Sequence, residues 1–432
     1  MTVEIYETTN VFTPGDFPTH TYVAVDESRN ENSLRKALAT PGMVASLSGP
    51  SKSGKTVLVR RVAGGANSVI RVSGAEVRTA NDLWHAVLDR LGTPDVLTQE
   101  QSSTKGVSGG ANVSVPLSSS PGAPTLDIHG SASAQSKYKS TAEFNRKGMQ
   151  YAIELLRSRN LVLLVDDFHY MTHDTQTQVA REIREAAQQG AKICVASVPH
   201  RSDDVVRSNP ELRGRITAID SGYWRPESLK AIGEKGFPLL RVVAGNELLS
   251  AFAAESLGSP QLMQALCLEA CRNQGVCETG INEHELPNRV GFREEIFREV
   301  SATADFRSAL QAAHAGELSR GVQRKTYRFT DETEGDSYRA VLLAIAQPPP
   351  ALSISKADVI ARVAAVCVDE RPSTPRIVHS CKFVAKRLKE IAPSERIVEY
   401  EDDVLTVIDP YFLFYLRWSG QLDAIATRHT RS

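Results

Sequence analysis

One uninterrupted eight-residue pattern limits the folds open to this chain more than any other feature. It fits G-x-x-x-x-G-K-[ST] and consists of Gly49-Pro50-Ser51-Lys52-Ser53-Gly54-Lys55-Thr56. The glycines let the backbone wrap so that its N–H groups point at phosphate oxygens, and a following helix adds partial positive charge at its N-terminus. Apolar residues precede the pattern, and a helical pattern begins near Lys55. The sequence therefore predicts a phosphate-binding loop between a strand and a helix.

The last residues of this pattern carry the chemistry of a nucleotide site. The Lys55 ammonium is expected to reach the β- and γ-phosphates, and the Thr56 hydroxyl to ligate Mg²⁺. Lys52 stands where a small residue is common, so it adds positive charge near the phosphates, and we expect the loop to tolerate it. The predicted nucleotide-binding residues are the whole pattern and the next residue, Val57.

The segment "NLVLLVDDFHYM", residues 160–171, supplies a second part of the site. A continuous apolar run of this length is typical of a parallel strand buried on both faces. Asp166 is expected to hold Mg²⁺ through water, and Asp167 to orient or deprotonate the attacking water. Glu is the longer carboxylic acid that could fill the same role at the second position. Because Asp is one methylene shorter, we expect competent but slow turnover.

Further polar side chains flank the next two predicted strands. "CVASVPHR" places Ser197 and His200 after one strand, where either would sense the γ-phosphate. "NPELRGRITAID" places Arg213 and Arg215 just before the fifth strand. An arginine there would reach the nucleotide of a neighbouring subunit and stabilise transition-state charge.

Strands that alternate with helices predict an α/β fold with a parallel sheet. A change of composition at 101–140, rich in Gly, Ser, Pro and Ala, predicts a flexible insertion or an exposed hairpin. The expected organisation is an N-terminal lead-in at 1–30, a P-loop core at 31–222, a helical lid at 223–300, a polar connector at 301–335 and a small α+β domain at 336–425.

Composition narrows the functional classes. A net charge of −1 over 432 residues gives no global basic field that would indicate nucleic acid. No apolar run approaches 18 residues, and the acidic, polar start argues against a secretory signal, so we expect no membrane contact. Six cysteines lack CxxC pairs, which favours free thiols over a zinc site. A cytoplasmic, reducing compartment fits these features.

The ordered set "GPSKSGKT", "LVLLVDDFH", "CVASVPH" and "ELRGRITAIDSGYW" resembles the AAA+ superfamily. Within it, the chain resembles the branch shared by STAND signalling ATPases, origin-recognition-type ATPases and transposition-type ATPases. The resemblance implies ATP rather than GTP and favours Arg215 as the arginine that acts on a neighbour. It also implies a lid over 251–271 in which Gln261 stands where many relatives have an arginine that touches the γ-phosphate. A neutral amide adds no charge, which again supports slow turnover.

Residues 336–418 resemble a winged-helix module. Its predicted third helix has an apolar seam and, on another face, His379, Lys382, Lys386 and Lys389. One interpretation is that the basic face of this helix, within 374–389, contacts duplex DNA. The alternative is that this face is only exposed to solvent. The expected wing carries four acidic residues that would repel a phosphate backbone: Glu399, Glu401, Asp402 and Asp403.

These features predict an ATP-dependent molecular switch with slow hydrolysis that self-associates and acts on a protein effector or sensor. By analogy, the architecture would suit a bacterial stress, anti-phage or mobile-element system. The main alternative is a DNA-binding loader or transposition-type ATPase. A third hypothesis is a nucleotide-sensing transcriptional regulator.

Overall fold

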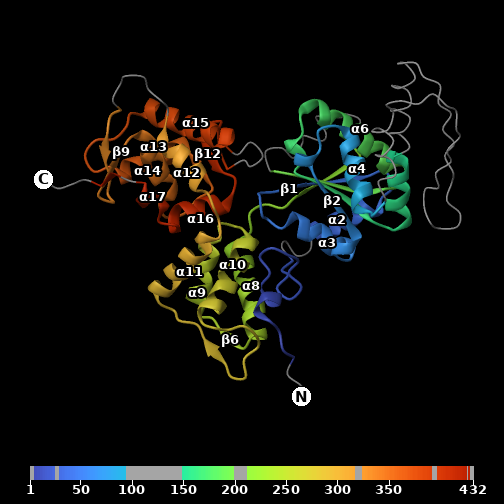
Figure 1. Cartoon of the computed structure of the whole chain (residues 1–432), viewed down its shortest axis with the longest axis horizontal. Coiled ribbons are helices and arrows are strands. Elements are labelled where there is room, and N and C mark those ends of the chain that lie inside the picture. The colour runs from blue at the N-terminus through green and yellow to red at the C-terminus, as the bar shows by residue number, and fades with distance from the viewer. Residues whose placement is uncertain are drawn as a thin grey trace, which may run out of the picture.

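The computed structural model describes residues 4–24, 29–93, 148–198, 212–316, 324–391, 397–425 and 427–428. The expected insertion at 101–140 and His200 lie outside these residues. Three parts follow one another along the chain: a sheet with helices on both faces, a helical lid, and a smaller α+β domain at the C-terminal end (Figure 1). None of the described helices is both long and apolar enough to span a membrane.

A five-stranded sheet with the order β2-β3-β4-β1-β5 forms the first part. All four strand pairs are parallel. β1 and β3 are buried along their whole length, as continuous apolar runs predict. The carboxyl ends of the central strands meet at one edge, and the phosphate loop begins there. The strands are β1 (Val44–Ser48), β2 (Val69–Ser73), β3 (Val162–Asp166), β4 (Lys192–Ser197) and β5 (Ile216–Asp220).

Helices cover both faces of this sheet and enclose a separate apolar cluster on each. α2 (Arg29–Ala39) and α3 (Lys55–Ala63) pack on one face, where Leu34 and Val59 join the inward side chains of β1 and β3. On the other face lie α4 (Ala80–Arg90), residues 148–158 and α6 (His173–Gln188). The sheet domain therefore has its own core on each side.

The lid consists of α8 (Pro226–Leu239), α9 (Asn246–Glu255), α10 (Pro260–Asn273) and α11 (Val290–Ala302), with a short parallel pair, β6 (Val242–Val243) and β7 (His284–Glu285). The N-terminal segment, predicted only as a lead-in, packs on this lid through α1 (Thr8–Val11) and the residues after it (Figure 1). Phe12 is fully buried, and its ring occupies the space that a side chain at Gly236 would need. Gly236 therefore lets the segment approach α8 closely.

The C-terminal domain is built on α13 (Ser337–Ala346), α14 (Lys356–Val366) and α15 (Thr374–Ile391), with an antiparallel sheet in the order β10-β12-β11. Its strands are β10 (Ser353–Ser355), β11 (Val398–Glu401) and β12 (Val404–Val407). After them come α16 (Pro410–Trp418) and α17 (Gln421–Ala424). The predicted fold class is confirmed: a parallel P-loop-type sheet, a helical lid and a smaller α+β domain.

The segment 301–335, expected to be a polar connector, contains regular structure. α12 (Arg307–Ala315) packs on α15 and buries Ala309, Leu310 and Ala313. β8 (Tyr327–Arg328) and β9 (Thr333–Gly335) pair with each other, and β13 (Thr427–Arg428) pairs with β9. Only three side chains of α12 are buried, so its apolar stripe is too short to stand out in a segment of polar composition.

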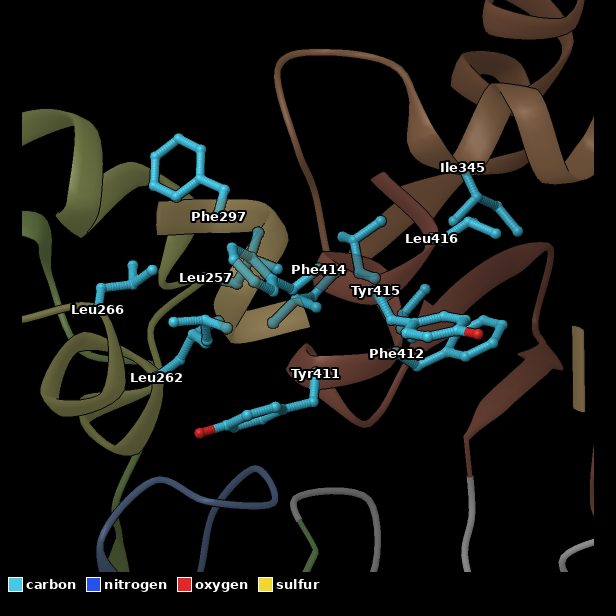
Figure 2. Close-up of a cluster of buried hydrophobic side chains, with 14 of the residues drawn as sticks. Leu257, Leu262, Leu266, Phe297, Ile345, Tyr411, Phe412, Phe414, Tyr415 and Leu416 are labelled. Carbon is cyan, nitrogen blue, oxygen red and sulfur yellow. The ribbon is translucent and has the colours of Figure 1, made fainter. Parts of the chain in front are cut away.

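One continuous apolar cluster joins the lid to the C-terminal domain. α16 lies between them, and Phe412, Phe414 and Leu416 are buried among lid and domain side chains (Figure 2). The rings of Phe297, from α11, and Phe414 have centroids 6.0 Å apart in an edge-to-face arrangement. Because apolar contact is unbroken here, the lid and the C-terminal domain form one packed unit, distinct from the two cores of the sheet domain.

A mostly buried ion pair reinforces this junction. Arg417 of α16 forms two hydrogen bonds with the Glu255 carboxylate of α9, at 3.1 and 2.7 Å, and the two side chains are 10% and 12% exposed. Trp418 donates its indole N–H to the same carboxylate at 2.7 Å. The Glu255 carboxylate thus accepts hydrogen bonds from two residues of the neighbouring domain.

Truncation of the Glu255 carboxylate should lower the free energy of unfolding far more than truncation of an exposed carboxylate. Glu255→Ala leaves a buried guanidinium unpaired, and we expect a loss of about 3 kcal/mol in the free energy of unfolding. The control is Glu294→Ala, which breaks an exposed i,i+4 pair with Arg298 and should change stability by less than about 0.5 kcal/mol. Urea denaturation measures both, and equal losses would contradict a buried junction.

Candidate nucleotide site

The loop between β1 and α3 has a tightly wrapped backbone. Lys52 and Gly54 have φ of 61° and 92°, in the left-handed region, and α3 begins at the next residue, Lys55. A Cβ on Gly49 would lie 2.8 Å from the carbonyl oxygen of Ser221, which follows β5. Only glycine therefore fits at the start of the loop, where the chain passes close to the neighbouring strand.

Lys55 and Thr56 begin α3 facing β3. The Lys55 ammonium donates to the carbonyl oxygens of Gly49 and Pro50, at 2.8 and 2.7 Å. Burial lowers the pKa of Lys55, against the opposing charges of Asp166 and Asp167. The Thr56 hydroxyl donates to Asp166 Oδ2 at 3.2 Å. The predicted lysine, hydroxyl and first acid are thus brought together at the carboxyl edge of the sheet.

Asp167 turns away from β3 in the left-handed conformation, with φ of 55°. Its carbonyl oxygen lies so close to Gly74, after β2, that a side chain there would overlap it. Burial, followed by the charge of Asp166, raises the pKa of Asp167 to about 6, although Lys55 and Arg71 lower it. A carboxylate with its pKa nearer neutrality is better suited to accept a proton.

A cavity of about 590 Å³ opens beside these residues. This volume lies within the usual range of small-molecule sites. Two buried hydroxyls near it, those of Ser53 and Ser197, have no hydrogen-bond partner among the described residues. Buried polar groups are normally paired, so a ligand with acceptor oxygens would satisfy the Ser53 hydroxyl. The loop backbone, Lys55 and this hydroxyl together fit a nucleoside triphosphate.

Ser197 ends β4 directly beside Ser48, the last residue of β1. Its carbonyl oxygen accepts from the Gly49 N–H at 3.2 Å, so it lies next to the first residue of the phosphate loop. The buried position of its hydroxyl is compatible with the predicted sensing role. The other sensing candidate, His200, lies outside the described residues.

The N-terminal segment lines the same cavity, which the sequence patterns did not indicate. Residues from Thr13 to Val23 contribute to its wall opposite the loop. They are held by the lid: Gln264 of α10 accepts from the Thr13 N–H at 3.2 Å and donates to the Thr21 hydroxyl at 2.6 Å. The only signal of this contact in the sequence is Gln264 itself, a polar side chain at a helical position that faces the core.

The lid meets the phosphate loop at the N-terminus of α10. Ser259 caps this helix and also donates to the Lys52 carbonyl oxygen at 3.4 Å. Gln261, two residues after Ser259, lines the cavity. The Trp224 indole donates to the Ser53 carbonyl oxygen at 3.0 Å, so the aromatic turn after β5 also holds the loop.

Two charged contacts at the site were not predicted. Arg71 of β2 donates through Nε to Asp166 Oδ2 at 2.8 Å. Lys52, expected to add charge near the phosphates, instead donates to both carboxylate oxygens of Asp409 at 3.0 and 2.8 Å. Its ammonium also lies 4.2 Å from the ring centroid of Tyr411. Asp409 precedes α16, so the phosphate loop directly contacts the C-terminal domain.

Arg215 is exposed and lies far from this cavity. The register pairs Val44 with Ile216 and Ser48 with Asp220, so Arg215 precedes β5 at the end of the sheet opposite the phosphate loop. Arg213, the other candidate, is exposed at the same end. Neither arginine can therefore contact the cavity of its own chain.

Solved structures match this chain over nearly its whole length at low identity and with TM-scores below 0.5. Cdc6p from Pyrobaculum aerophilum is 15% identical with a TM-score of 0.41, and the match covers 97% of this chain and 99% of that one. The Aeropyrum pernix ORC2 protein, in ADPNP–ADP complexes, is 13% identical with a TM-score of 0.49, covering 96% and 98%. The Aeropyrum pernix ORC1 protein in complex with DNA is 11% identical with a TM-score of 0.43, covering 98% and 97%.

No family model matches the sequence, and no curated protein matches it.

Proposed function

We propose that this chain is an AAA+-type ATPase that works as a molecular switch. The observation that carries the proposal is that one loop residue, Lys52, contacts all the parts a switch must couple. Its backbone belongs to the phosphate loop, its carbonyl oxygen accepts from Ser259 of the lid, and its ammonium binds Asp409 of the C-terminal domain. A ligand that reshapes this loop must disturb both contacts.

The residues around the cavity support ATP binding with Mg²⁺. Loop N–H groups and Lys55 would hold the β- and γ-phosphates, while Thr56 and Asp166 would hold Mg²⁺, which supplies charge that stabilises the departing phosphate. Asp167 would accept a proton as a water oxygen bonds to the γ-phosphorus. The bond to the bridging oxygen breaks, and ADP takes its electron pair. The short side chain of Asp167 and the neutral Gln261 support slow turnover.

The geometry at Lys52 supports coupling between nucleotide and domain position. Phosphate oxygens in the loop would attract the same ammonium that now binds Asp409. Because the lid and the C-terminal domain share one core, release of this contact would let them reorient together. Nucleotide state would thus set how the C-terminal domain is presented to an effector, a sensor partner or a second copy.

The exposed position of Arg215 supports a role between subunits. It cannot reach the site of its own chain, yet it is exposed at one end of the sheet domain, where a neighbour in a ring or filament would place its nucleotide. We infer that Arg215 completes the site of the next subunit, as the AAA+ and STAND resemblance suggests.

DNA is the alternative partner. We infer that the helix–strand–helix–helix–strand–strand order of the C-terminal domain is that of a winged helix, with α15 as its third helix. α15 buries Ile377, Cys381, Val384 and Leu388, and it carries Lys382, Lys386 and Lys389 away from that seam. However, Lys386 and Arg387 both contact Glu390, and the turn between β11 and β12 is acidic. We therefore favour the protein switch over a DNA loader or a transcriptional regulator.

ATP turnover by the purified chain, with and without duplex DNA, tests this choice. We expect slow turnover that is indifferent to DNA and falls at least about 100-fold in Lys55→Ala and Asp167→Ala. Turnover that rises with DNA, and loses that rise in a Lys382/Lys386/Lys389→Ala variant, would support the loader. DNA retention without turnover would support the regulator. Failure of the wild type to bind ATP would contradict all three.

Mixing two inactive variants tests the role of Arg215. Arg215→Ala keeps its own phosphate loop but lacks the arginine, whereas Lys55→Ala keeps the arginine but cannot hold nucleotide. If Arg215 acts on a neighbour, the 1:1 mixture recovers a substantial fraction of wild-type turnover at concentrations where subunits associate. The Arg213→Ala variant, mixed in the same way, is the control. No recovery, or full activity of Arg215→Ala alone, would exclude the role.

A further inference from the structure

The cavity contains an arginine that none of the assigned roles uses. Arg71 lines the cavity, and its side chain is 51% exposed. Gln261 of the lid, which also lines the cavity, is neutral. This inference rests on the proposed function, because it concerns the same nucleotide.

The backbone fixes the side on which Arg71 projects. β2 is an edge strand paired in parallel with β3, with Val69 opposite Val162 and Ser73 opposite Asp166. Val69 packs into the apolar cluster on the α3 face of the sheet. Because side chains alternate along a strand, Arg71, two residues later, projects on that same face. The strand therefore directs the guanidinium toward the phosphate loop.

The contacts of Arg71 leave most of its hydrogen-bonding capacity unused. Its Nε donates to Asp166 Oδ2, the same oxygen that accepts from Thr56. A guanidinium has five N–H donors, and the other four have no hydrogen bond among the described residues. Asp166 is nearly buried, with 7% of its side chain exposed, whereas Arg71 opens onto the cavity. The guanidinium thus holds positive charge beside the residues expected to hold Mg²⁺.

We propose that Arg71 binds the terminal phosphate of ATP within its own subunit, in the role that a lid arginine would otherwise fill. A divalent ion held by Asp166 and Thr56 would supply the positive charge that Arg71 otherwise provides to the Asp166 carboxylate. The half-exposed ion pair is weak enough to give way. The freed guanidinium would then face the cavity, where its planar fork matches phosphate geometry.

A positioning role is the competing explanation. In that case Arg71 only orients Asp166 for the metal, and its loss would affect ADP and ATP alike, since both are held through the same metal site. A terminal-phosphate contact affects only the triphosphate. The ratio of the two affinities therefore separates the two roles without any measurement of turnover.

The experiment is calorimetric titration of the full chain with ATPγS and with ADP, each in Mg²⁺. We expect Arg71→Ala to bind ATPγS roughly 10- to 100-fold more weakly, because a charged hydrogen bond is lost, while its affinity for ADP stays within about twofold. Arg71→Lys should retain part of the preference for ATPγS. The control is Arg90→Ala, which breaks an exposed pair with Glu76, and thermal unfolding checks that each variant is folded.

If Arg71→Ala lowers the affinities for ATPγS and ADP equally, the proposal is wrong and Arg71 only positions Asp166. If neither affinity changes, the proposal is also wrong, and Arg71 forms only a surface ion pair. A wild type that binds neither nucleotide would instead refute the proposed function itself, and this role with it.

Discussion

The ion pair between Lys52 and Asp409 is the interaction that links the phosphate loop to the C-terminal domain. It joins the phosphate loop to the first turn of α16, and α16 belongs to the core shared by the lid and the C-terminal domain. Asp409 also accepts from the Tyr411 N–H at 2.9 Å, so one carboxylate both caps the helix and binds the loop. The phosphate loop therefore directly contacts the packed unit that the lid and the C-terminal domain form.

Magnitudes indicate which contacts give way when a ligand binds. The Lys52 and Asp409 side chains are 29% and 18% exposed, and a partly exposed pair of this kind is worth about 1 kcal/mol. A ligand shifts such an equilibrium only by the difference between its affinities for the two states, and a tenfold difference in affinity corresponds to about 1.4 kcal/mol. The buried aromatic cluster around Phe414 and the Glu255–Arg417 pair resist separation much more strongly. A nucleotide that binds tenfold more tightly to the state without the Lys52–Asp409 contact would therefore release the C-terminal domain from the loop, but would leave it packed on the lid.

The sequence predicted those parts of the site that lie within short, continuous motifs. Lys55, Thr56 and Asp166 meet as expected, because the alternation of strands and helices predicts a parallel sheet, and the carboxyl ends of parallel strands lie at one edge. Lys52 was placed correctly in the loop, but its partner Asp409 lies 357 positions away. No local pattern encodes a contact of that separation.

Two further features were missed for different physical reasons. Arg71 lies in the short strand "VIRVS", where a single arginine on an edge strand is ordinarily a solvent-exposed side chain. The N-terminal segment has no strong periodicity, and its position depends on Phe12 and on the absence of a side chain at Gly236. The segment 301–335 was misjudged because the apolar stripe of α12 is only one turn and a half long.

The most direct test of the switch is the affinity of Asp409→Asn for ATPγS. Asparagine caps a helix as well as aspartate, so the substitution removes the charge that holds Lys52 and leaves α16 intact. If phosphate and Asp409 compete for Lys52, Asp409→Asn binds ATPγS about fivefold more tightly than the wild type, while Asp402→Asn in the wing leaves the affinity unchanged. Unchanged or weaker binding by Asp409→Asn would contradict the account.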